Sequence, residues 1–102
     1  MSEAAQILSH VPNSGIVQLP GRRFPGIVLQ GDTLSGMYDF SLELLEQARM
    51  AKDEESYYGI LDFAELVHDH LVHYEETLKR EGMTLPYAKS VAERPVADNF
   101  DQ

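Results

Sequence analysis

The residues best suited to chemistry are two adjacent arginines and two polar residues that follow them in one short segment. Residues 19–34 read LPGRRFPGIVLQGDTL and include Arg22, Arg23, Gln30 and Asp32. Guanidinium groups bind carboxylates and phosphates with a fixed, two-pronged geometry. A helix that begins near Asp32 would present free backbone amides to the same anion. The segment is therefore a candidate site for a small ligand or an anion.

The same segment also has a purely structural interpretation, which we favour. Glycine and proline usually serve turns, and Asp32 or Thr33 is a suitable N-cap for a helix. Pro20-Gly21 has the composition of the central pair of a type II turn, because glycine accepts a positive φ at the second position. The ligand site is kept as the alternative function.

Helical spacing of apolar residues dominates the middle of the chain and predicts helices over about 33–52 and 54–81. We expect Asp53 to cap the second helix and Gly82 to end it. Almost no linker separates the helices, which favours an antiparallel hairpin. The expected core stripe of the second helix consists of Ile60, Phe63, Ala64, Val67, Leu71, Tyr74 and Leu78.

Turn signals divide the N-terminal third into short strands within about residues 5–30, ending at a tight turn near Gly31. Residues 5–11 fit a strand or a helical turn, and we favour the strand. The predicted fold class is α+β, with a small antiparallel meander of two to three strands followed by a helical hairpin packed on it. Residues 1–82 form the single domain, and residues 83–102 are expected to be a partly disordered C-terminal extension.

Residues 19–34 also fit the pattern L-P-G-R-x-F-P-G-x-x-x-Q-G-D-[ST]-L throughout, with Arg23 in the variable position. In this the chain resembles an uncharacterised family of small bacterial proteins, over about residues 7–82. That family has no assigned activity, so the resemblance implies a fold unit and no mechanism. It singles out Arg22, Gln30 and Asp32 as the matching polar positions of any functional surface.

A histidine cluster in the second helix suggests a metal site at first sight. Glu65 and His68 are three residues apart, and Asp69 and His73 are four apart, as in metal-binding helices. At about 100° per residue, however, His68 and His70 fall on opposite flanks of the face that carries the acids. The expected core is apolar and offers no inward carboxylates. We therefore expect no metal and no cofactor.

The negative charge is concentrated in the helices. The chain carries a net charge of −9, of which residues 33–82 supply −8, from four bases against twelve acids. Such a surface repels nucleic acids and anionic membranes and attracts a basic protein. The expected contact face on the second helix carries Asp62, Glu65, Asp69 and Glu76. The simpler interpretation of the charge by itself, which we favour, is that it serves only solubility.

Aromatic and apolar residues off the helical stripes are a further candidate surface. Phe40 and Leu42 lie away from the first stripe, near the core-edge residues Tyr38 and Tyr57 and their neighbour Tyr58. They mark either a homodimer or partner surface or a site covered by the C-terminal segment. The sequence leaves both interpretations open.

The absence of several common motifs argues against secreted, membrane-spanning and enzymatic functions. The chain has no cysteine, no signal-peptide pattern and no apolar run of about 18 residues, so we expect a cytoplasmic protein without a membrane span. It lacks a nucleophile elbow, a P-loop and a dinucleotide fingerprint, which argues against an enzyme. The favoured function is a protein-interaction module, of the immunity or antitoxin type, that binds a basic partner.

Overall fold

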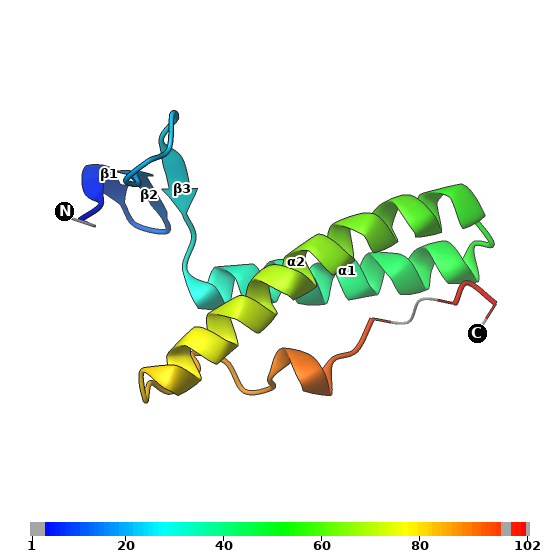
Figure 1. Ribbon diagram of the computed structural model, residues 1–102. Coiled ribbons are helices and arrows are strands. Elements are labelled where there is room, and N and C mark those ends of the chain that lie inside the picture. Colours follow the sequence, from blue (N-terminus) through cyan, green and yellow to red (C-terminus); the bar gives the residue numbers. More distant parts are fainter. Residues whose placement is uncertain (1–3, 97–98, 102) are drawn as a thin grey trace.

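The computed structural model describes residues 4–96 and 99–101 and has the predicted α+β architecture (Figure 1). A three-stranded antiparallel sheet precedes two long antiparallel helices, and a 3-10 turn follows them. The elements are β1 (Gln6–Val11), β2 (Ser14–Gln18), β3 (Gly26–Val28), α1 (Gly31–Met50), α2 (Glu54–Arg80) and η1 (Val91–Glu93).

The sheet is a meander with the order β1-β2-β3, so the prediction of a strand over residues 5–11 is confirmed. Asn13 turns the chain between β1 and β2 with a φ of 63°. A register shift between Ile7 and Ser9 marks a bulge in β1. Pairing of Ile7 with Val17, and of Gly15 with Val28, places Ile7, Val17 and Val28 on one face of the sheet.

The helical hairpin contains the core. Its buried side chains include Tyr38 and Leu45 from α1 and Tyr57, Ala64 and Leu71 from α2. Asp53 caps α2 as predicted, because its carboxylate accepts a hydrogen bond of 3.1 Å from the Ser56 amide. Hydrogen bonding from the Ser56 side chain, and then from its amide, holds the pKa of Asp53 below its ordinary value. The described helices do not combine the length and apolar composition needed to cross a bilayer.

The helix α1 starts slightly earlier than expected, and the predicted tight turn at Gly31 and the predicted cap at Asp32 or Thr33 are wrong. The helix begins at Gly31 rather than Thr33, its N-cap is Gln30 and no side chain caps it. The Asp32 carboxylate instead accepts a hydrogen bond of 2.9 Å from the Thr33 amide, inside the first turn. Gly31 is helical and buried against Tyr74, and a Cβ at Gly31 would lie 2.2 Å from that ring. Packing against α2 therefore sets the start of α1.

The sheet sits at one end of the hairpin rather than along it (Figure 1). The two parts meet at a hollow of about 450 Å³, which is lined by Ile27 of β3, by Leu29, by Leu34 of α1 and by His70, His73, Tyr74 and Thr77 of α2. The molecule is consequently elongated. Its radius of gyration is 16.4 Å, against about 13 Å for a compact chain of this length.

The C-terminal segment runs back along the hairpin, although its sequence pattern predicts partial disorder (Figure 1). Val91 of η1 is buried in the hairpin core beside Tyr38, Val67 and Leu71. Farther along, Val96 and Phe100 pack against the core cluster around Tyr57. Residues 97, 98 and 102, which share that expectation, lie outside the described residues.

Candidate functional site

The turn after β2 exposes the two arginines. Gly21 has a φ of 76°, as the type II turn prediction requires, and the Arg22 amide donates to the Leu19 carbonyl at 3.3 Å. The Gln18 side-chain amide donates to the Arg22 carbonyl at 2.6 Å, which closes the loop. The Arg23 guanidinium lies over the Phe24 ring, 5.1 Å from its centroid. Residues 19 and 21–26 line a hollow of about 410 Å³.

The other two residues of the predicted ligand site lie elsewhere. Gln30 lines a separate hollow of about 370 Å³ on the sheet, together with residues of β1, β2 and β3. Asp32 is exposed in the first turn of α1 and lines neither hollow. No hollow described here is lined by Arg22, Arg23, Gln30 and Asp32 together. The arginine loop alone is the part of this site that has a concave form.

The acidic face of α2, which we define as Asp62, Glu65, Asp69 and Glu76, is exposed, as the helical spacing predicts. Two exposed apolar side chains flank these acids on one side, because at about 100° per residue Leu66 lies about 40° and Phe63 about 100° from the direction of Asp62, away from the other three acids. Leu66 is 58% exposed, and Phe63 is 45% exposed although the sequence analysis placed it in the core stripe. A two-helix hairpin buries only a narrow stripe of each helix, and Phe63 lies beyond its edge. The exposed surface of α2 therefore combines the carboxylates with an apolar edge.

The histidines of α2 do not converge. Among the described residues, no three histidine, aspartate or glutamate side chains lie close enough together to hold a metal ion. His68 is partly buried and its Nδ1 lies 3.3 Å from the Asp69 carboxylate. His70 and His73 line the hollow between α2 and β3 instead.

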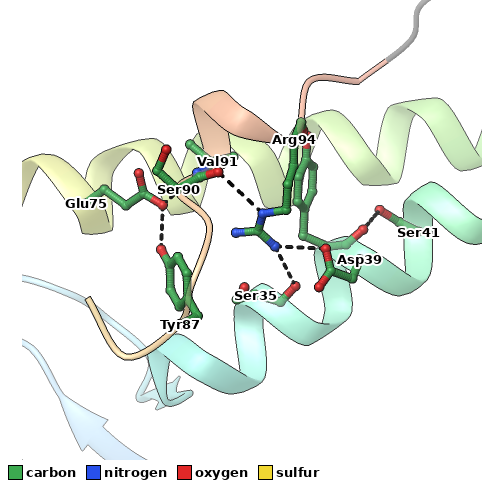
Figure 2. Close-up of polar contacts among 9 residues, drawn as sticks. Ser35, Asp39, Ser41, Glu75, Tyr87, Ser90, Val91 and Arg94 are labelled. Carbon is green, nitrogen blue, oxygen red and sulfur yellow. Dashed lines mark hydrogen bonds and ion pairs between the residues drawn. The ribbon is translucent and has the colours of Figure 1, made fainter.

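Glu75 of α2 fastens the C-terminal segment to the hairpin (Figure 2). Its carboxylate accepts hydrogen bonds from the Tyr87 hydroxyl at 2.6 Å and from the Val91 amide at 2.9 Å. Burial, together with the hydrogen bond to Glu75, raises the pKa of Tyr87 far above its ordinary value. The phenol therefore stays neutral and keeps donating this hydrogen bond.

Arg94 fastens the same segment to α1 (Figure 2). Its side chain is 10% exposed, and its Nη1 donates to the Asp39 carboxylate at 2.9 Å and to the Ser35 carbonyl at 3.4 Å. The guanidinium lies 5.3 Å from the Tyr38 ring centroid and 5.2 Å from that of Tyr87. Nη2 is buried without a hydrogen-bond partner, so these cation–π contacts stabilise the buried charge.

The C-terminal segment covers Tyr38 and Tyr57 but leaves Phe40 and Tyr58 exposed. Phe100 lies edge-on to Tyr57 at a centroid distance of 5.3 Å, and the Tyr38 hydroxyl donates to the Arg94 carbonyl. Leu42 packs against both core clusters. Of this group, Phe40 remains 59% exposed and Tyr58 43% exposed.

Sequence reasoning missed Asp39, Glu75 and Arg94 as a group. They come from three separate elements, and no spacing rule connects them. The available signal was a single arginine in a tail that follows an acidic hairpin. An isolated arginine that follows an acidic hairpin in the sequence can be tested as a residue that fastens the tail to the helices.

A family model described as "Family of unknown function (DUF6959)" matches residues 1–87, which include the sheet and both helices. The chain belongs to this family. No curated protein and no solved structure matches it. The DUF6959 region thus contains the arginine loop and the acidic face of α2, whereas η1 and Arg94 follow it.

Proposed function

We propose that this DUF6959 chain is a non-catalytic protein-interaction module that binds a basic protein through the acidic face of α2. The observation that carries the proposal is the exposure of Phe63 and Leu66 beside four exposed carboxylates. An immunity or antitoxin role in the cytoplasm is the biological setting that we propose for such a binder.

The two kinds of side chain on this face have different physical roles. Apolar side chains at the centre of an interface supply affinity when they are desolvated. Carboxylates at the rim attract a basic surface, accelerate association and disfavour acidic competitors. Such an interface combines specificity for a basic protein with affinity from a small apolar contact.

Charge reversal on the acidic face tests the proposal directly. We expect Glu65→Lys/Asp69→Lys to abolish recovery of the native partner in a pull-down at low salt, while the fold is kept. High salt should weaken recovery by the wild-type protein, because it screens exposed charges. Glu43→Lys/Glu93→Lys is the matched control, since it changes the net charge equally at exposed positions that lie outside α2. A partner that binds the reversed protein as well as the wild type refutes the proposal.

The alternative function is small-ligand or anion binding at the Gly/Pro/Arg-rich segment. It is supported by the hollow of about 410 Å³ that Arg22 and Arg23 line. Inorganic phosphate is a suitable probe, followed by chemical-shift changes at Arg22 and Arg23. Saturable shifts that Arg22→Ala removes would favour this function over protein binding.

A further inference from the structure

We propose that the basic surface bound by the acidic face is the arginine-bearing sheet of a second copy of this chain. In a two-fold symmetric dimer, the sheet of each copy covers the open face of the other copy's hairpin. The inference rests on the function proposed above, because it names the partner of that same face.

The first argument is the amount of exposed surface. The chain exposes 7647 Å², whereas a compact monomer of 11.5 kDa exposes about 5,800 Å². The excess is about 1,800 Å², which is more than the ~800 Å² that each partner contributes to a standard protein–protein interface. The isolated sheet and the uncovered side of the hairpin both contribute to this excess.

The second argument is that the C-terminal segment covers only one side of the hairpin. Glu75 holds that segment, and Leu66 lies nine residues away on the same helix. At about 100° per residue, Leu66 points in the opposite direction from Glu75. Leu66 and Phe63 therefore lie on the side that the segment leaves uncovered, which agrees with their exposure.

The chain's own sheet is not placed over these residues. Residues 29 and 30 alone join β3 to α1, and the sheet meets α2 at the level of Tyr74. Phe63 lies eleven residues from Tyr74, or about 16 Å along the helix. The close packing of Gly31 on Tyr74 fixes this junction. A second molecule is therefore better placed to cover Phe63.

The sheet has a complementary apolar face. Ile27 contributes to the hollow against the chain's own α2, whereas Ile7, Val17 and Val28 lie on the other face and line the hollow of about 370 Å³. Ile7 is 65% exposed and Val28 is 45% exposed. This open face offers a concave apolar surface to the Phe63 and Leu66 side chains of a second copy.

The third argument is charge. Residues 4–30 contain Arg22 and Arg23 and no acid, whereas residues 31–82 contain thirteen acids against four bases, a net charge of −9. Two such chains attract each other only where the sheet of one faces the hairpin of the other. A symmetric dimer uses this contact twice and leaves neither pair of surfaces open, so assembly stops at two copies.

A charge-swap experiment tests the dimer. We expect wild-type protein to sediment as a dimer at micromolar concentration. Arg22→Glu/Arg23→Glu and Glu65→Lys/Asp69→Lys should each raise the dissociation constant by about tenfold or more, because each places like charges at the contact. An equimolar mixture of the two variants should dimerise again, as should a chain that carries all four substitutions. Glu43→Lys/Glu93→Lys is the control and should dimerise like the wild type.

The outcomes separate this inference from the proposed function. A monomer at all concentrations overturns the dimer, but the proposed function stands if a pulled-down partner still responds to Glu65→Lys/Asp69→Lys. If neither charge variant raises the dissociation constant of the dimer, the inference is also overturned. The same holds if the equimolar mixture of the two variants fails to dimerise. Circular dichroism of each variant shows whether its fold is intact, and the altered residues are all exposed.

Discussion

Gly31 lies at the junction between the sheet and the hairpin, where there is no room for a side chain. The residue is buried in the first turn of α1, where the Tyr74 ring occupies the space of a Cβ. Its φ is not positive, so the glycine is required for close approach and not for a turn. Sequence patterns alone do not separate these two roles.

Gly31→Ala should destabilise the protein by about 1–3 kcal/mol, because the new methyl group forces Tyr74 or the backbone to move. Gly36 is the matched control, since it is exposed in the same helix and a Cβ there meets no atom within 4 Å. Gly36→Ala should stabilise the protein by about 0.5–1 kcal/mol. Urea unfolding of both variants measures the difference. Equal changes in both would contradict the account of Gly31.

The Tyr87 phenol makes stability depend on pH in the alkaline range. Its pKa in the folded protein is raised, first by burial and then by the hydrogen bond to Glu75, and burial also raises that of Tyr38. The folded state therefore holds protons that the unfolded state releases near its ordinary pKa of about 10. The contribution to stability is complete below that pH and is lost as the pH rises above it.

Absorbance titration of tyrosinate measures this effect. In the folded protein, part of the absorbance change should appear at higher pH than it does in denaturant, where all five tyrosines are equivalent. Tyr87→Phe should reduce that late part. If folded and denatured proteins titrate alike, the phenol of Tyr87 is not buried in solution.

At the scale of elements, the C-terminal segment closes one groove of the hairpin through Glu75 and Arg94. Arg94→Met keeps the apolar stem but removes the contacts to Asp39 and Ser35, so it should destabilise the fold by about 2 kcal/mol. Lys89→Met, at an exposed position of the same segment, should have little effect. Thermal unfolding distinguishes the two variants, and equal melting temperatures would show that Arg94 is not an anchor.

The elements were predictable where local rules determine them. Helical periodicity located both helices, Asp53 marked the start of α2, and turn residues marked the three strands. The start of α1 was not predictable, because it depends on a contact between Gly31 and Tyr74, 43 residues apart. The packed C-terminal segment depends on isolated anchors that have no period.

The candidate site was predictable to a similar degree. The helical period placed the acids of α2 on one exposed face, but it also placed Phe63 in the core. The period gives the direction of a side chain, whereas the width of the buried stripe depends on how many neighbours the helix has. With one helix and one extended segment as neighbours, α2 leaves both Phe63 and Leu66 exposed.

At the scale of the molecule, stability should differ between its two parts. The strands carry exposed apolar side chains such as Ile7 and Val11, whereas Leu71 and Ala64 in α2 are fully buried. Segments with few buried contacts open at lower free energy. Hydrogen exchange at low protein concentration should therefore be faster in β1–β3 than in the centre of α2. Equal protection would indicate one cooperative unit.

The region matched to DUF6959 ends at Tyr87, but the hairpin groove is filled by Val91 and Arg94, which come later. The region matched by the family model therefore ends before the packed part of this chain does. In effect, the last residues are a peptide ligand tethered to its own receptor. A short tether holds such a ligand at a local concentration of about millimolar. Contacts too weak to retain a free peptide are then sufficient to complete the fold.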